Sequence, residues 1–210
     1  GRHERLQFDR ILLIFEELQF ERPSETIVRA PDELLPIDRK RADERQLHHN
    51  RILQLLAEKA PLSVVLDTMV RDVEAIHPAM LCSVLLLDAQ GKHLHHGAAA
   101  SLPAFFTEAL DGTAIGPGVG SCGTSAFTGQ RVIVEDLATS PWWVPFLDLA
   151  RRADLGACWS QPIVSAQGKV LGTFAIYHRR PCRPEPEELL LIEDEARLAG
   201  LAIEKSMAEA

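Results

Sequence analysis

Hydrophobic positions recur with helical spacing in the first half of the chain. Between residues 39 and 60 they repeat every three to five positions, and Pro61 ends that pattern. Residues 62–76 then carry apolar side chains at steps of three and four, which places them on one face of a helix. Pro78 follows directly. The pattern therefore predicts two consecutive helices, over residues 39–60 and 62–76.

From residue 81 onward the pattern changes to short apolar runs that are separated by turn residues. The predicted strands are residues 81–88, 92–100, 131–135, 157–164 and 169–178. Two short helices are predicted over residues 103–110 and 144–153, and a long one follows Pro186. Hairpins flanked by helices, without alternating strand–helix–strand units, indicate an α+β fold with a mainly antiparallel sheet.

The first 38 residues differ from the rest of the chain. Apolar side chains in residues 6–18 have mixed spacing, and residues 22–36 contain three prolines and many charges. We expect residues 1–38 to be a linker or the tail of an upstream domain, and residues 39–210 to form the main domain. The chain begins with Gly1, so we expect a fragment of a longer protein.

Composition narrows the possible partners. With 46% hydrophobic residues, the 210-residue chain can bury a substantial core. A formal net charge of −8 disfavours nucleic acid, because a phosphate-binding surface needs clustered Lys and Arg. No apolar run reaches the length of a membrane span. The cysteines are dispersed without a C-x-x-C pair, which favours reduced thiols and a cytoplasmic location. They are Cys82, Cys122, Cys158 and Cys182.

Residues 118–129 combine four glycines with small polar side chains. Glycine permits close approach and backbone angles that a Cβ would block. Ser121, Thr124 and Ser125 are typical of a helix start, where free N–H groups can face a ligand. The segment therefore predicts either a wall of a ligand pocket or a tight loop-to-helix junction that binds nothing.

Several spaced motifs resemble a GAF domain, the small-molecule sensory module of signalling proteins. The resemblance covers roughly residues 40–208 and is most detailed to a bacterial subgroup found with PAS, GGDEF, EAL or histidine kinase modules. The motifs are residues 82–88, 111–112, 115–116, 120–124, 134–137, 157–160 and 170–174, together with Pro141 and Trp143.

This resemblance implies a twisted antiparallel sheet with terminal helices on one face and a ligand pocket on the other. The pocket walls correspond to residues 120–129, residues 136–153 and the strand near residue 158. The implied ligand-binding residues are Ser121, Cys122, Thr124, Asp136, Trp142, Trp143, Cys158 and Trp159. The ligand and any cofactor stay unidentified. The patterns of cyclic-nucleotide-binding and bilin-attaching GAF domains are missing, so neither ligand is expected.

Each candidate has a structural alternative. The tryptophans either stack on a flat ligand or pack in the core. Asp136 is better explained as a turn cap than as a base. Cys122 lies near a helix start and is either a redox-active thiol or a buried inert one. Three histidines, at positions 93, 95 and 96, alternate across a strand, so they cannot converge on one metal.

We therefore predict a non-catalytic regulatory module that binds a small molecule and controls a covalently linked output domain, of the cyclic-di-GMP or histidine kinase type. We expect a homodimer through the terminal helices, because four residues of the last helix follow heptad spacing. These are Ile192, Ala196, Ala199 and Ile203. Two alternatives stay open. The first is a free methionine sulfoxide reductase that acts through Cys122, and the second is a dimerisation spacer without a ligand.

Overall fold

The computed structural model describes residues 36–209, and residues 40–210 form one compact unit. The expected linker over residues 1–38 falls almost wholly outside the described part and stays a prediction. The helices are α2 (Pro36–Ala57), α3 (Leu62–Ile76), α4 (Ala104–Leu110), α5 (Gly120–Thr128), the 3₁₀ helix η2 (Pro141–Phe146), α6 (Leu147–Arg152) and α7 (Pro186–Glu209). The strands are β1 (Leu81–Leu87), β2 (His93–Ala99), β3 (Thr113–Ala114), β4 (Val132–Val134), β5 (Ala157–Val164) and β6 (Val170–His178).

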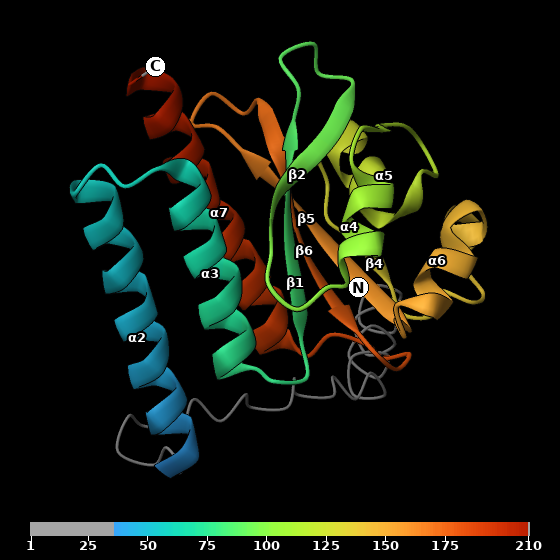
Figure 1. The fold of residues 1–210 in the computed structure, drawn as a ribbon. Helices are drawn as coiled ribbons and strands as arrows, with labels where there is room; N and C mark the ends of the chain where they lie inside the picture. Colours follow the sequence, from blue (N-terminus) through green and yellow to red (C-terminus); the bar gives the residue numbers. More distant parts are fainter. Residues whose placement is uncertain (1–35, 210) are drawn as a thin grey trace, which may run out of the picture. The chain divides into compact units, whose positions relative to one another are not determined.

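The strands form one six-stranded antiparallel sheet in the order β3-β2-β1-β6-β5-β4 (Figure 1). Hairpins β1–β2 and β5–β6 supply the four inner strands, and β1 pairs with β6 to join them. The α+β fold predicted from the hydrophobic pattern is confirmed. The short edge strand β3 was not predicted, because two residues are too few to show alternation.

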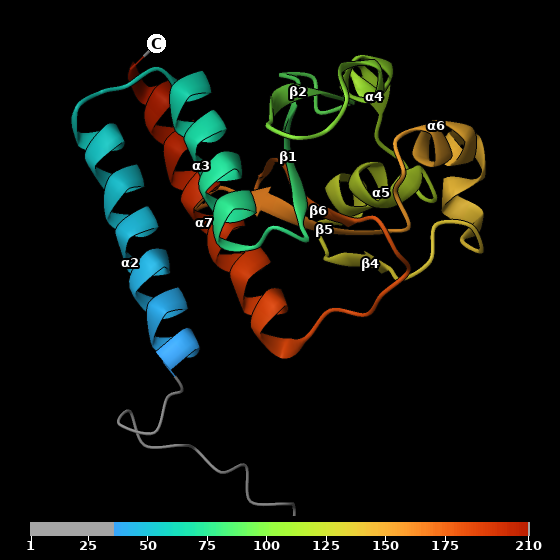
Figure 2. The same cartoon turned by 60° about the horizontal axis from the view of Figure 1, so that its bottom comes forward.

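Helices α3 and α7 cover one face of the sheet, and α2 lies beside them in the same layer (Figure 2). Alternate strand residues such as Val84, Trp159 and Phe174 point into this helix-side core. Gly200 lets α7 approach the sheet closely, since a Cβ there would lie 2.9 Å from the carbonyl oxygen of Val164. None of the described helices is long and apolar enough to cross a bilayer.

The opposite face carries α4, α5, η2 and α6 (Figures 1 and 2). The intervening strand residues, among them Leu85, Cys158 and Tyr177, point to this side and form a second core. Neighbouring residues of one strand therefore belong to different cores, as the period of two requires.

The structure corrects the helix predicted over residues 144–153. The segment instead forms η2 followed by α6, with Pro145 inside η2. Proline lacks the backbone N–H that either kind of helix uses, so Pro145 interrupts the hydrogen-bonded run and the regular α-helix begins only at Leu147. The first predicted helix also begins earlier, at Pro36 rather than at residue 39.

The heptad residues of α7 have a different role from the one predicted. The four residues are at most 6% exposed and belong to the helix-side core of their own subunit. They cover the sheet and do not form a seam with a partner. The residues concerned are Ile192, Ala196, Ala199 and Ile203. Spacing alone could not distinguish these two uses of one apolar face.

A buried ionic cluster joins α2 to the other two helices of its layer. The His48 ring on α2 contacts Asp72 of α3 at 3.2 Å and Glu195 of α7 at 3.0 Å. Arg51 also reaches Asp72, at 3.0 Å. Burial lowers the pKa of His48, but hydrogen bonds and charge from Glu195 and Asp72 outweigh it and leave the pKa raised. The two carboxylates thus stabilise the imidazolium form, in which both ring nitrogens can donate.

Candidate functional site

The first turn of helix α5 packs directly against the sheet. Gly120 begins the helix with φ of +54°, and its first seven residues are buried. The hydroxyl of Ser121 donates to the carbonyl oxygen of Cys158 on β5 at 3.4 Å. The indole N–H of Trp143 donates to the same hydroxyl oxygen at 2.9 Å. Ser121 therefore joins α5, β5 and η2.

A small cavity lies between α5, η2, β3 and the sheet. It offers about 30 Å³ to the centres of water molecules, which is room for about two waters or a molecule of a few heavy atoms. The lining residues come from the glycine-rich segment, from α4 and η2, and from the strands. They are Leu85, Leu94, Leu110, Thr113, Val119, Gly120, Ser121, Cys122, Gly123, Trp143, Phe146 and Tyr177.

The cavity wall is mostly apolar. None of the described residues that line it is Lys, Arg, His, Asp or Glu. An ion that entered would lose its hydration without gaining a partner of opposite charge, which costs several kcal/mol or more. The wall therefore favours a small uncharged molecule over a nucleotide or another multiply charged ligand.

Hydroxyl and thiol groups gather under the floor of the cavity. The Tyr177 hydroxyl lies 3.8 Å from the sulfur of Cys122 and 3.3 Å from the hydroxyl of Ser83. The hydroxyls of Ser160 and Thr173 are buried and have no hydrogen-bond partner within residues 36–209. Buried polar groups are normally paired, so two unpaired hydroxyls beside one thiol require an explanation.

The two thiols of this cluster differ in acidity. The Cys158 thiol, and after it the hydroxyls of Ser160, Tyr177 and Thr173, can donate to a Cys122 thiolate, which lowers the pKa of Cys122 to about 7 against the opposing effect of burial. Its place in the first turn of α5 acts in the same direction, because the positive end of a helix stabilises a thiolate. Burial raises the pKa of the Cys158 thiol, which stays protonated. The pair thus holds one acidic thiol and one proton-bearing thiol.

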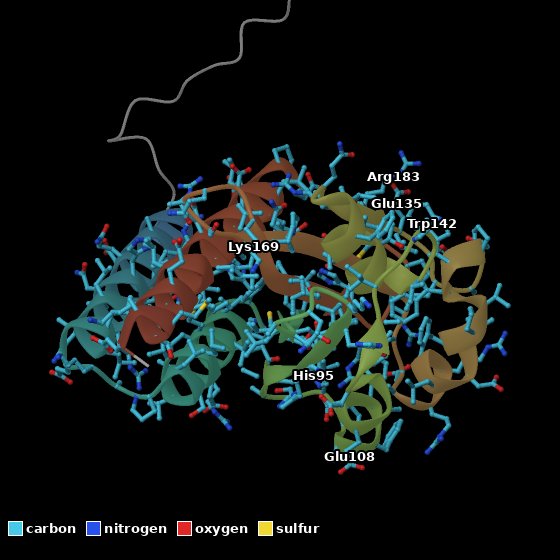
Figure 3. The ribbon with its side chains drawn as sticks, turned by 90° about the horizontal axis from the view of Figure 1, so that it is seen from above. His95, Glu108, Glu135, Trp142, Lys169 and Arg183 are labelled. Atoms are coloured by element: carbon cyan, nitrogen blue, oxygen red, sulfur yellow. The ribbon has the colours of Figure 1, made fainter. Side chains whose placement is uncertain are left out.

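The two adjacent tryptophans point in different directions. Trp143 is buried and lines the cavity, whereas Trp142 is 39% exposed and lies over Gly118 on the outer side of α5 (Figure 3). Thr124, another predicted ligand residue, donates its hydroxyl to the Gly120 carbonyl oxygen at 2.7 Å. Trp142 and Thr124 border an outer groove rather than the cavity.

Two further predicted ligand residues lie away from the cavity. Asp136 accepts a hydrogen bond from the N–H of Ala138 at 2.9 Å and caps the turn, as its structural alternative supposed. Trp159 is fully buried in the helix-side core, where its ring lies 4.4 Å from that of His178. Since Cys158 faces the cavity side, the next residue on β5 must face the helices.

Four polar residues of the cluster were missed by sequence reasoning. They are Ser83, Ser160, Thr173 and Tyr177. The sequence does contain a signal for this cluster. Residues two or four positions apart share one face of a strand, as Cys158 and Ser160 do on β5 and Thr173 and Tyr177 do on β6. Polar residues at alternate positions of central strands indicate a polar cluster on one face of the sheet.

The histidines of β2 pair with acidic neighbours. His93 contacts Asp88 at 3.0 Å, and His95 contacts Asp111 at 3.4 Å. Within the described part of the chain, no group of three or more His, Cys, Asp or Glu residues has a geometry suited to a metal ion.

A small cavity on one sheet face and terminal helices on the other agree with the resemblance seen in the sequence. The family model described as GAF domain matches residues 59–204. The chain belongs to the GAF family. It is also 42% identical over 166 residues to the methyl sulfide methyltransferase-associated sensor of Methanosarcina acetivorans. That match covers 79% of this chain and only 17% of the much longer sensor.

Solved GAF-like structures share the fold. A domain of a two-component sensor histidine kinase protein from Sinorhizobium meliloti aligns with a TM-score of 0.59 and 21% identity, over 71% of this chain and 94% of that one. The free methionine-R-sulfoxide reductase of Neisseria meningitidis aligns with a TM-score of 0.64 and 18% identity, over 81% and 94%. At this level of sequence identity the alignments show a common fold, and they do not by themselves show a common activity.

Proposed function

We propose that this GAF domain is a sensory module that takes up a small uncharged molecule in the cavity beneath α5. Ser121, Cys122 and Trp143 would contact the molecule, and Cys158 would lie behind Cys122. The observation that carries the proposal is the cavity with its unpaired polar floor, because a ligand or its chemistry would satisfy groups that the protein leaves unpaired. Similarity to a sensor over most of the chain supports the same reading.

The sheet itself offers a route from the cavity to the terminal helices. On β5, Cys158 faces the cavity side and Trp159 faces the helices. On β6, Tyr177 likewise faces the cavity side and Ile176 faces the helices. A shift of either strand toward an occupied cavity would therefore move side chains that contact α3 and α7. Packed layers respond as units, because interiors are dense and resist gradual deformation.

The output would lie in a covalently linked domain, of the cyclic-di-GMP or histidine kinase type, with this domain acting as a regulator rather than an enzyme. A homodimer through the terminal helices stays part of the proposal. Its surface must use outward-facing residues, since the heptad residues of α7 are buried. Five exposed apolar side chains on α2 and α7 qualify, namely Leu47, Leu53, Leu190, Leu201 and Met207.

The small size of the cavity favours one rival, a spacer that binds no ligand. The reductase alternative is less favoured. Free methionine sulfoxide carries an ammonium and a carboxylate group, and the described cavity lining offers neither of them a charged partner.

Native mass spectrometry of the chain, incubated with the small-molecule fraction of a cell extract, tests the proposal. Val119→Phe fills the cavity, and Val144→Phe, at an exposed position of η2, is its matched control. We expect a non-covalent adduct of low mass on the wild type and on Val144→Phe, and none on Val119→Phe. A wild type without any adduct, or equal adducts on all three proteins, would support the spacer instead.

A further inference from the structure

The cluster beneath the cavity contains a pair of buried thiols that the sensory proposal does not by itself use. We infer that Cys122 and Cys158 form a reversible disulfide when a hydroperoxide enters the cavity. The inference rests on the proposed sensory function and deepens it by naming the chemical class of the signal.

Three contacts bring the two cysteines together. The Ser121 hydroxyl, next to Cys122, touches the Cys158 carbonyl oxygen at 3.4 Å, so the first turn of α5 lies directly on β5. Cys158 is the cross-strand partner of Tyr177, and their side chains share one face of the sheet. The Tyr177 hydroxyl in turn lies 3.8 Å from the Cys122 sulfur.

The neighbours of Cys122 suit an attacking thiolate. The hydroxyls of Ser160 and Thr173 have no partner within the described residues and lie on the same face of the sheet as Cys158 and Tyr177, where they can donate to a negative charge. Tyr177 supplies a third hydroxyl, 3.8 Å from the Cys122 sulfur. Their unpaired state in the neutral protein is thereby explained, because the charged sulfur is the acceptor that they lack. Cys122 also lines the cavity, whereas Cys158 lies behind it.

The chemistry has two steps. The Cys122 thiolate attacks one oxygen of the hydroperoxide, so an S–O bond forms and the O–O bond breaks. The leaving oxygen takes up a proton equivalent to the one that Cys122 released, and water or an alcohol departs. The Cys158 sulfur then attacks the Cys122 sulfenic acid, an S–S bond forms, the S–O bond breaks, and hydroxide leaves with the Cys158 proton as water. Two thiols are oxidised and one peroxide is reduced.

The cavity selects among oxidants by size and charge. Hydrogen peroxide has two heavy atoms and no charge, so it fits a space of about 30 Å³ with an uncharged wall. The same wall disfavours charged disulfides such as oxidised glutathione. The other two cysteines are placed differently. Cys82 is buried in the helix-side core, and Cys182 is half-buried and packs against that same core.

The test treats the reduced chain with one equivalent of hydrogen peroxide and counts free thiols after denaturation. We expect the count to fall from four to two, with a mass loss of two hydrogens and a cross-linked peptide pair that contains Cys122 and Cys158. Dithiothreitol should restore four thiols. The rate should be about tenfold lower at pH 6 than at pH 8, as a thiol with a pKa of about 7 requires.

Single variants identify the partners. Cys158→Ser should stop at the sulfenic acid, which dimedone traps on Cys122, and Cys122→Ser should keep its three thiols under the same conditions. Cys182→Ser is the matched control and should still form the disulfide. A folded wild type that keeps four thiols, or a disulfide that involves Cys82 or Cys182, overturns the inference. Neither result bears on adduct formation in native mass spectrometry, so the sensory proposal is judged separately.

Discussion

The two faces of the sheet each bury a polar cluster, and the two clusters are built in opposite ways. On the helix face, His48 is held between two carboxylates, and every member has a partner. On the cavity face, Ser160 and Thr173 have none among the described residues, and Cys122 has only weak sulfur contacts. A satisfied buried network fixes how elements pack, whereas an unsatisfied one keeps binding capacity for something else. We therefore assign a structural role to the first cluster and propose a sensing role for the second.

The largest effect on stability is expected at His48. His48→Ala leaves Glu195 buried without its partner, which should lower the free energy of unfolding by about 3–5 kcal/mol. Urea denaturation at pH 7 measures this change. The matched control is His49→Ala, one position along α2 and exposed, which should change it by less than about 0.5 kcal/mol. Similar losses for both variants would mean that the ionic cluster has no special role.

The next effect concerns how η2 is held over the cavity. Trp143→Phe removes the indole N–H that bonds to Ser121, together with some buried apolar area, and should cost roughly 1–2 kcal/mol of unfolding free energy. Trp142→Phe is the control, since that ring is 39% exposed, and it should cost less than about 0.5 kcal/mol. Thermal or urea unfolding of both variants measures these two changes in unfolding free energy. A larger loss for Trp142→Phe would contradict the assignment of the buried tryptophan.

The pH dependence of stability separates the two clusters further. The pKa of His48 is raised in the folded protein above its usual 6.5. Its contribution is therefore fully present below pH 6.5 and is lost as the pH rises through the folded value. The difference in unfolding free energy between wild type and His48→Gln should shrink from pH 6 toward pH 9. A difference that stays constant or grows over this range would contradict a charged His48.

The smallest effect is expected where a polar group is unpaired. Thr173→Val removes a hydroxyl without a partner in the described structure and keeps the side-chain volume, so stability should change by less than about 0.5 kcal/mol or rise slightly. Ser121→Ala is the contrast, because it breaks two hydrogen bonds and should cost about 1–2 kcal/mol. A clear loss for Thr173→Val in urea unfolding would show that its hydroxyl is already bonded.

Most of the fold could be predicted from the sequence, because hairpins and amphipathic helices leave local periodic patterns. The helix start in the glycine-rich segment was predicted from its small polar residues, which are typical of helix N-termini. Trp159 was assigned to the wrong face, since its face depends on the register of β5, which the sequence alone does not fix. His48 and Tyr177 acquire their roles only from partners far away in the chain, at Glu195 and Cys122. No local pattern marks such pairs.

Hydrogen–deuterium exchange of Val119→Phe, compared with wild type and with Val144→Phe, tests most directly whether the cavity is coupled to the helix face. If the sheet transmits the state of the cavity, a filled cavity should change the exchange rates of backbone amides in α7. The amides concerned are those of residues 192–203, where α7 packs on β5 and β6. Val144→Phe should leave those amides as in the wild type. Changes confined to α5 and η2 would contradict the account, because the cavity would then have no mechanical link to the terminal helices.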